Sequence, residues 1–498
     1  MAVNVEWRSS LSLVGAVLTW LTVPLVPCLA LAVSDGTDVV PFATTIALTL
    51  LLGSALRQLT DERHIHDREA FLMVALTWLA VAVVGAVPFR LAGTGVFDSW
   101  VDALFESTSG ITTTGATVLV DFDAHSPAIM LWRQIIQWLG GLGILLIATA
   151  VLARLSVGGA KLMETESQTQ DVTRLTVHFA DTAKILLGLY VGITAVVAVL
   201  LQTLALTGLA PNVTPFDAVA HALTSVATAG FSPRPDSVGA FGPAVQWVLV
   251  AAMAVGATNF VLIWTVLQGN LDRLRGSEEF RMYAGILAGF STLLGAILVV
   301  DAEFATLEAT VRHAVFQIVS LVSTTGYATV DFELWSAPAK QLLFVCMFVG
   351  GMAGSTTCSI KTFRWLVVAK AFDRDLLVAA TPEMVRPVRL SGQVVDEETI
   401  RDVFSYTLLA LLIFLLGSVA IVVLSAHAGH SVTEFEALSA AASTFFNIGP
   451  AFGQAGPFDS YHSFPTASKV LMTVMMWVGR IEIIPVLVLL RLSFWRRP

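Results

Sequence analysis

Apolar residues run along this chain in ten stretches, each long enough to cross a membrane as a helix. The hydrocarbon core of a bilayer requires roughly 20 helical residues. The stretches cover residues 11–33, 39–56, 70–89, 128–153, 184–207, 243–268, 282–300, 341–369, 404–428 and 467–492. The first is too long for the apolar part of a signal peptide, so we interpret it as a retained helix. The pattern predicts an all-α polytopic membrane protein with ten transmembrane helices.

The charges between these stretches predict which way the chain faces. Ten crossings place both termini on one side, and the loops of that side carry seventeen lysines and arginines. The opposite loops carry four, namely Arg90, Arg234, Arg312 and Lys340. Because cytoplasmic loops are rich in basic residues, we expect both termini in the cytoplasm and the chain in the plasma membrane of the cell. The acidic outer loops either concentrate cations or form an ordinary solvated surface.

Composition narrows the classes of function. Of the 498 residues, 56% are hydrophobic and 13% are charged, which is about half the charged share of a soluble domain. A soluble enzyme is therefore a poor interpretation. The net charge of −9 argues against a nucleic-acid partner, because phosphate binding requires a surplus of basic residues. Membrane lipid is the expected surrounding.

Four of the five outer loops have nearly equal length and share one sequence pattern. Each contains one glycine preceded by an alanine at twelve residues and by a hydroxyl residue at six. The glycines are Gly115, Gly230, Gly326 and Gly449; the alanines are Ala103, Ala218, Ala314 and Ala437; the hydroxyl residues are Ser109, Thr224, Ser320 and Ser443. Such self-similarity predicts one helix–loop–helix unit repeated four times after an N-terminal helical hairpin.

Each of these loops contains a segment that we predict to be a short helix. The segments run from Phe97 to Ile111, Phe216 to Ala227, Leu307 to Ser323 and Val432 to Phe446. They are too short to span a bilayer, so re-entrant half-helices are expected. Acidic residues lie in or near their first turns, namely Asp98, Asp102, Asp217, Glu434 and Glu436. We assign these acids to the helix dipole, with direct cation binding as the alternative.

A short irregular strip follows each half-helix and contains the repeated glycine. Strip 1 covers residues 112–116, strip 2 residues 227–231, strip 3 residues 323–327 and strip 4 residues 446–450. Irregular backbone at membrane depth must be buried in protein or line a watery cavity. Because glycine accepts conformations that align successive carbonyls, four strips around one axis would form rings of oxygens that replace the water around a cation. The alternative for any single strip is a glycine that only ends a helix.

These considerations give a predicted filter that binds a cation through twelve residues. They are Thr113, Thr114, Gly115, Thr228, Ala229, Gly230, Thr324, Thr325, Gly326, Asn447, Ile448 and Gly449.

The stretch 341–369 is too long and too rich in small residues for one uninterrupted helix. It contains Gly350, Gly351 and Gly354, followed by a polar run that starts at Ser355 and Thr356. We predict two half-helices joined by a loop inside the membrane, which requires that the loop face a cavity. A face of small residues for helix packing is the alternative.

The strips and the glycine-rich loop resemble the Trk/Ktr/HKT superfamily of potassium transporters, and most closely its TrkH branch. The resemblance covers nearly the whole chain, and its most specific motifs are Phe105-Glu106-Ser107-Thr108-Ser109-Gly110, Gln137-Trp138-Leu139-Gly140-Gly141, Ser323-Thr324-Thr325-Gly326-Tyr327, Gly350-Gly351-Met352-Ala353-Gly354-Ser355-Thr356 and Gly479-Arg480-Ile481-Glu482. It implies four fused pore units, a homodimer with one pore per protomer, and a cytoplasmic TrkA-type nucleotide-binding regulatory subunit. It also implies that the loop 350–359, here named the gate loop, obstructs the pore beneath the filter.

Two departures from the family pattern stand out. In strip 4, Asn447 replaces a hydroxyl residue and Pro450 follows the glycine, and the gate loop carries Thr357-Cys358-Ser359 where relatives have more glycines. In members of the family that prefer sodium the first filter glycine is often serine, so the resemblance implies that Gly115 favours potassium.

Charged residues inside the last stretches require an explanation, because a charge near mid-bilayer is expensive unless it is paired. Arg480 and Glu482 lie two positions apart on the last stretch, so their side chains point in different directions and are not expected to pair with each other. The resemblance places Arg480 near the pore beneath the filter, in contact with the gate loop or as a repulsive charge for cations, with a static packing role as the alternative. We expect Lys361 and Arg364 to reach the cytoplasmic face.

We therefore expect potassium uptake through a channel-like pore, with no enzyme activity and no cofactor in this chain. The expected units are residues 1–57 (hairpin), 58–160, 161–270, 271–372 (with the broken second helix) and 373–498 (with a cytoplasmic linker). An obligatory proton- or sodium-coupled potassium symporter is the alternative. The linker 373–402 is either a contact for the regulator or a solvated segment.

Overall fold

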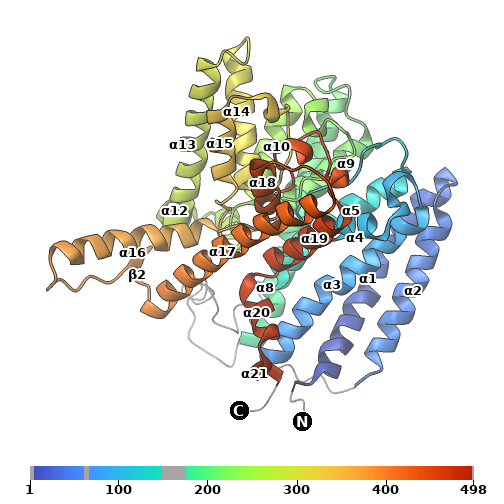
Figure 1. Ribbon diagram of the computed structural model, residues 1–498, viewed down its shortest axis with the longest axis horizontal. Coiled ribbons are helices and arrows are strands. Elements are labelled where there is room, and N and C mark those ends of the chain that lie inside the picture. Colours follow the sequence, from blue (N-terminus) through green and yellow to red (C-terminus); the bar gives the residue numbers. More distant parts are fainter. Residues whose placement is uncertain (1–4, 61–66, 148–174, 496–498) are drawn as a thin grey trace.

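The computed structural model describes residues 5–60, 67–147 and 175–495, and this part of the chain is predominantly helical (Figure 1). Its longer helices are α1 (Trp7–Asp35), α2 (Val39–Arg57), α3 (Asp67–Ala92), α5 (Pro127–Ile147), α8 (Leu175–Leu206), α10 (Pro243–Gly256), α13 (Glu278–Val300), α15 (Ala337–Cys346), α16 (Thr362–Ala380), α17 (Glu397–His427) and α19 (Thr466–Arg480). The shorter elements α11 (Phe260–Leu267), α12 (Leu271–Gly276), α20 (Ile483–Leu490) and α21 (Leu492–Trp495) follow α10 or α19. One hairpin, β1 (Arg389–Leu390) with β2 (Gln393–Val394), connects α16 to α17.

Seven of the described helices are long and apolar enough to cross a membrane: α1, α2, α3, α5, α8, α13 and α17. A further pair, α10 and α11, passes the same test together but is bent by 104°. The prediction of a polytopic helical protein agrees with this, whereas the number of ten crossings stays a prediction.

The four predicted short helices are present: α4 (Trp100–Ile111), α9 (Pro215–Val226), α14 (Leu307–Val322) and α18 (Glu434–Phe445). Each begins at a serine or threonine whose hydroxyl accepts a hydrogen bond from the N–H three residues later; these caps are Ser99, Thr214, Thr306 and Thr433. Such a cap satisfies one of the N–H groups that a helix start leaves free. Asp217 and Glu436 complete capping boxes. These two acids therefore cap their helices directly, in addition to the helix-dipole role that was assigned to all the first-turn acids.

Three of the predicted spans are broken, and only one of these breaks was predicted. Residues 341–369 form α15, an irregular segment and α16, as expected. The prediction that 243–268 is one helix is wrong, because α10 ends at Gly256 and Asn259 caps the new helix α11. Likewise 467–492 divides into α19 and α20 at Glu482, whose φ of 63° is left-handed.

The four short helices lie between long ones, and the resulting units contact one another in a ring. Within units, α4 packs on α3 and α5, α9 on α8 and α10, α14 on α13 and α15, and α18 on α17 and α19. Between units, α5 packs on α9 and α10 on α14, while α19, near the end of the chain, packs on α4, near its start. The short helices therefore gather in the interior.

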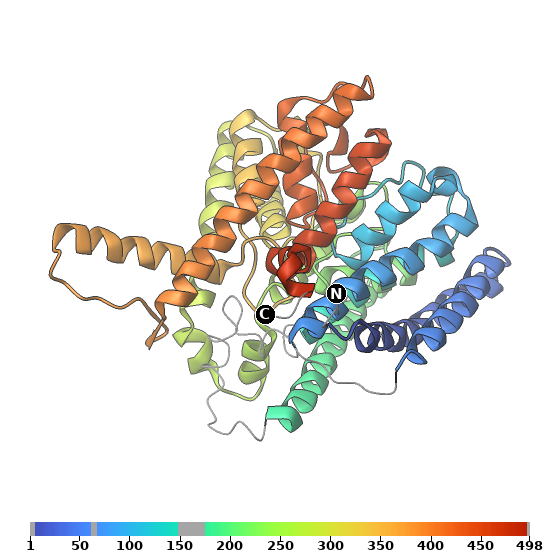
Figure 2. The same ribbon diagram turned by 60° about the horizontal axis from the view of Figure 1, so that its bottom comes forward.

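Two peripheral elements frame this ring (Figures 1 and 2). The hairpin of α1 and α2 lies at one edge, and α16 with the β-hairpin projects from the opposite edge. Gly15 and Gly53 allow α1 and α2 to approach closely, since an added Cβ on either would lie under 3.0 Å from the other helix. The predicted boundary at residues 160–161 lies outside the described residues.

Candidate functional site

All four strips leave their helices through the same turn. In each strip the residue before the glycine donates its N–H to the carbonyl of the hydroxyl residue five positions earlier, at 2.9 Å. The donors are Thr114, Ala229, Thr325 and Ile448, and the acceptors are Ser109, Thr224, Ser320 and Ser443. The repeat recognised in the sequence is thus a repeat of backbone geometry at these positions.

The backbone of each strip is left-handed at two alternate residues. The first is Thr113, Thr228, Thr324 or Asn447, with φ between 49° and 56°, and the second is the glycine, with φ between 81° and 110°. The residue between them does not share this conformation. Reversal of the backbone hand at every second residue turns successive carbonyls to one side of the chain. A β-branched threonine pays for φ > 0 with strain, which persists only where the surroundings enforce it.

The four strips form a closed ring around one axis. An added Cβ at each glycine would lie under 3.0 Å from a carbonyl oxygen of the next strip. Gly115 faces Ala229, Gly230 faces Thr325, Gly326 faces Ile448, and Gly449 faces Thr114. The order is therefore strip 1 to 2 to 3 to 4 and back to 1, and any side chain larger than hydrogen would collide with a neighbouring peptide.

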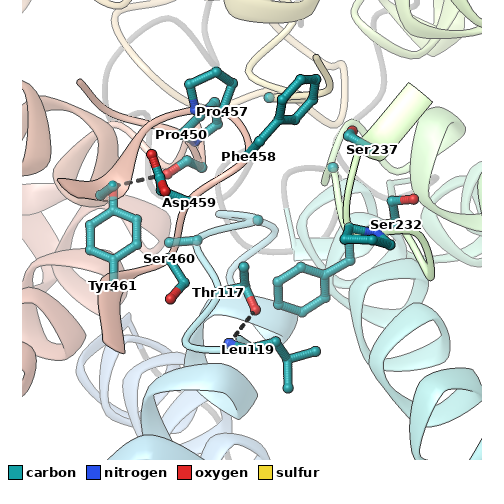
Figure 3. A pocket seen from close by; sticks show the side chains of 18 of the residues that line it. Thr117, Leu119, Ser232, Ser237, Pro450, Pro457, Phe458, Asp459, Ser460 and Tyr461 are labelled. Carbon is teal, nitrogen blue, oxygen red and sulfur yellow. Dashed lines mark hydrogen bonds between the residues drawn. The ribbon is translucent and has the colours of Figure 1, made fainter. Parts of the chain in front are cut away.

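The four glycines also line one cavity of about 180 Å³. Figure 3 shows Asp459 and Ser460 on one side of this cavity and Ser232 and Ser237 on the other. Partial burial, reinforced by the charges of Asp331 and Glu333, raises the pKa of the Asp459 carboxyl above its ordinary value. A carboxyl group therefore lines the cavity that the four glycines share.

The gate loop packs directly against two of the strips. The hydroxyl of Thr356 lies 2.9 Å from that of Thr228 in strip 2, and the N–H of Cys358 donates to the hydroxyl of Thr324 in strip 3 at 3.1 Å. Both partners are left-handed residues of their strips. The loop therefore contacts the ring at strips 2 and 3, and its residues are not among those that line the cavity beside Asp459.

The same loop satisfies the backbone groups that the break between α10 and α11 exposes. Met352 donates its N–H to the carbonyl of Ala257 at 2.9 Å, and Phe260 donates to the carbonyl of Gly354 at 3.1 Å. Thr356 donates its hydroxyl to the carbonyl of Gly256 at 3.0 Å. The two breaks compensate each other, which is how irregular backbone survives inside a membrane protein.

Arg480 joins the gate loop to the first unit. Its guanidinium donates to the carbonyl of Thr356 at 3.1 Å, to the sulfur of Cys358 at 2.6 Å and to the carbonyl of Gly140 at 2.9 Å. The side chain is 1% exposed. Of the predicted gate residues, Gly350 and Gly351 lie where the loop leaves α15, and Ser355 donates to the carbonyl of Met352.

The expectation that Arg364 reaches the cytoplasmic face is wrong. Its side chain is 3% exposed, pairs with Glu482 at 2.8 Å and lies over the ring of Tyr406 at 3.7 Å. The half-buried carboxylate of Glu482, at the break between α19 and α20, provides the counter-charge, so pairing replaces solvation of Arg364. Glu482 and Arg480 do not pair with each other, as predicted.

Two buried ion pairs near the strips were not predicted as functional. Glu106 on α4 accepts from Arg133 on α5 at 2.8 Å and also holds the N–H of Val118 at 2.9 Å. Asp102 pairs with Lys469, which joins α4 to α19. The family motif around Glu106 was the available signal, but which cation it meets depends on how the helices pack.

Comparisons with known proteins agree with this geometry. Residues 40–495 match the family model for TrkH, described as a cation transport protein. The chain is 33% identical to the Trk system potassium uptake protein TrkH of Halomonas elongata (98% of this chain, 99% of the relative) and 31% identical to that of Escherichia coli (91% and 92%). The crystal structure of the potassium transporter TrkH from Vibrio parahaemolyticus superimposes with a TM-score of 0.87 at 29% identity, over 99% of this chain and 100% of that one.

These relatives are transporters and not enzymes. Together with the apolar helices, the match identifies a membrane protein. The chain belongs to the TrkH family of cation transport proteins.

Proposed function

We propose that this chain takes up potassium across the cell membrane through a channel-like pore whose selectivity filter is formed by strips 1 to 4. The closed ring of glycines and neighbouring carbonyls carries the proposal. Carbonyl oxygens arranged in rings replace the hydration shell of a dehydrated cation. The names of the relatives supply the ion, because they are potassium uptake proteins.

The twelve predicted filter residues are the proposed K⁺ ligands through their backbone oxygens. Each half-helix directs its C-terminal end at the ring, where its partial negative charge favours a cation. The acidic Asp459 at the entrance adds to this attraction. No fuel reaction is needed, because one charge moving through 100 mV gains about 2.3 kcal/mol.

The gate loop is the proposed gate. Its contacts with Thr228 and Thr324 support a position against the exit from the ring, and the hydrogen bond from Arg480 to Thr356 supports a closed state. Opening then requires that the loop leave these partners. A cytoplasmic TrkA-type nucleotide-binding subunit is the proposed source of that movement, in line with the naming of the relatives as parts of a Trk system.

The remaining features of the proposal follow from the sequence pattern. They are ten membrane crossings with both termini in the cytoplasm, an N-terminal hairpin at 1–57, pore units at 58–160, 161–270, 271–372 and 373–498, and a homodimer in the plasma membrane. The even number of crossings is consistent with Figure 1, where α1 begins and α21 ends at the same end of the molecule.

Flux measurements in liposomes test the proposal. The purified chain is reconstituted, a membrane voltage is imposed, and uptake of rubidium and sodium tracers is measured. The proposal expects rubidium uptake that follows the voltage without any imposed proton or sodium gradient. Uptake that depends completely on a second gradient would instead establish the coupled symporter. In the same assay Gly115→Ser is expected to reduce the preference for potassium over sodium, and an unchanged preference contradicts the filter.

A further inference from the structure

Strips 1 and 3 are stabilised by a hydroxyl pair of their own. In strip 1 the hydroxyls of Thr112 and Thr114 lie 2.7 Å apart, and in strip 3 those of Ser323 and Thr325 lie 2.7 Å apart. In both cases the pair occupies the positions three residues and one residue before the glycine. Each hydrogen bond spans the left-handed residue, so it resists rotation of the peptide units that carry the filter carbonyls.

Strips 2 and 4 lack these hydroxyls. The corresponding residues are Ala227 and Ala229 in strip 2 and Phe446 and Ile448 in strip 4. Strip 4 is held by other groups, since the carbonyl of Gly449 accepts from the hydroxyls of Ser443 at 2.6 Å and Tyr461 at 2.9 Å. Strip 2 therefore requires a substitute from elsewhere in the fold.

The side-chain amide of Gln137 on α5 supplies this substitute. Its nitrogen donates to the carbonyl of Ala229 at 2.6 Å, and its oxygen accepts from the N–H of Phe231 at 2.9 Å. One amide thus grips the peptide units on both sides of Gly230, whose φ is 83°. A carbonyl oxygen has two lone pairs, so Ala229 can accept this bond and still face the axis.

No such polar side chain occupies the equivalent position of the second and fourth units. One glycine in each of three units marks the equivalent position on its second helix, namely Gly140, Gly256 and Gly479. An added Cβ on each of these glycines would lie under 3.0 Å from the carbonyl that ends the half-helix of its unit. Three residues before these glycines stand Gln137, Met253 and Met476. Gln137 is 0% exposed, whereas the equivalent residues of the second and fourth units are methionines. Burying an amide is unfavourable unless both of its polar atoms are bonded, so a glutamine at this position indicates that its hydrogen bonds are needed.

We propose that Gln137 is a positioning residue for ion selectivity: it holds strip 2 in the conformation that the hydroxyl pairs enforce in strips 1 and 3. The proposal rests on the filter proposed above and adds a residue outside the strips. Glycine is the most flexible residue, so the peptide units beside Gly230 need an external restraint. Without the restraint from Gln137, the carbonyl of Ala229 rotates away from the ring. The preference of the filter for potassium over sodium then falls.

The chain offers a matched control on the same helix. Gln134 is also 0% exposed, but neither atom of its amide has a hydrogen-bond partner among the described residues. Gln137→Met copies the residue of the second and fourth units, and Gln134→Met makes the same chemical change one turn away. Both remove a buried amide, and only the amide of Gln137 is hydrogen-bonded to a strip among the described residues.

The experiment measures the potassium-over-sodium permeability ratio from bi-ionic reversal potentials, together with the melting temperature of each variant. We expect Gln137→Met to lower the ratio about three- to tenfold, in keeping with the loss of two hydrogen bonds. Gln134→Met should leave the ratio unchanged. A wild-type ratio in a folded Gln137→Met protein overturns the proposal, and so does an equal loss in both variants.

A rescue variant separates positioning from general damage. Gln137→Met combined with Ala227→Ser and Ala229→Thr gives strip 2 the hydroxyl pair of strip 3. Recovery of the permeability ratio supports the proposal that Gln137 takes the place of a hydroxyl pair in strip 2. A folded triple variant whose ratio is still low contradicts that proposal. If the triple variant does not fold, the comparison of the two methionine variants decides.

Failure of this inference is distinguishable from failure of the proposed filter. Gly230→Ala, measured in the same assay, introduces a Cβ against the carbonyl of Thr325. If that variant behaves as the wild type, the filter itself is wrong. If it loses selectivity while Gln137→Met does not, the filter stands and only the role of Gln137 is refuted.

Discussion

The side-chain amide of Asn447 donates a hydrogen bond to the hydroxyl of Thr114 at 2.8 Å, across a separation of 333 residues in the sequence. This bond joins the last strip to the first and thereby closes the ring by a direct side-chain contact. The same amide nitrogen donates to the carbonyl of Met476 at 2.9 Å. Asparagine also tolerates the left-handed backbone, here with φ of 56°, better than most residues. The departure of strip 4 from the family pattern is therefore a structural device.

We predict that Asn447→Leu lowers both stability and selectivity. The variant keeps the size of the side chain but loses both hydrogen bonds and adds strain at a positive φ, for a total of about 2–4 kcal/mol. Thermal unfolding in detergent and reversal potentials check this. Asn447→Thr is the control, because threonine holds the same conformation in the other three strips; it should retain most of the flux. Equal losses in both variants would assign the effect to the lost amide bonds and not to backbone strain, and wild-type behaviour of Asn447→Leu would contradict the prediction.

We predict that Gly326→Ala lowers rubidium uptake at least about tenfold. The added methyl group would collide with the carbonyl of Ile448, and alanine resists the φ of 81°. Gly188→Ala on α8 is the control, because nothing lies within 4 Å of the added carbon there. Alanine has the higher helix propensity, so this control should keep full uptake and gain slightly in melting temperature. Full uptake by Gly326→Ala would show that the ring does not carry the ion.

We predict that Arg480→Ala raises basal rubidium flux without a change in the potassium-over-sodium ratio. The variant removes the bonds that tie the gate loop to α19 and to Gly140, while the strips keep their own contacts. Replacement of residues 350–359 by a continuous helix-forming segment should likewise alter gating more than selectivity. Flux with and without the regulator, and reversal potentials, distinguish the two effects. A loss of selectivity at unchanged flux would place Arg480 in the filter instead.

Ion uptake should fall when the outer solution is acidified, because Asp459 then gains a proton. Because the pKa of this carboxyl is raised, it gains a proton at a higher pH than an ordinary aspartate, whose pKa is about 3.9. The entrance therefore loses one negative charge as the outer pH falls through the raised pKa of Asp459. One charge at 5–10 Å in water contributes about 0.4–0.8 kcal/mol, so uptake at low salt should fall roughly two- to fourfold.

Asp459→Asn tests this response. It should show the reduced uptake at every pH and no further fall in that range. High salt should weaken the difference between the variant and the wild type, because exposed charges are screened. A pH profile that is identical in the variant and the wild type would remove Asp459 from the explanation.

Much of the fold and of the site could be predicted from local pattern. The half-helices, their first-turn acids and the glycines of the strips were found from spacing alone, because N-caps, left-handed turns and apolar runs are encoded by residues close to one another. The break after α15 was likewise visible as a run of small residues. The breaks at Asn259 and Glu482 were missed, because the partners that satisfy them come from the gate loop and from α16, which are distant in sequence.

By itself the sequence determined that four short helices lie in the long loops, that a break follows α15, and which glycines correspond. These properties depend on neighbours within a few residues. Only the tertiary structure decided the cyclic order of the strips, the pairing of Arg364 with Glu482, and the grip of Gln137 on strip 2. Buried polar groups choose their partners by where packed helices bring donors and acceptors together, and no spacing along the chain specifies that meeting.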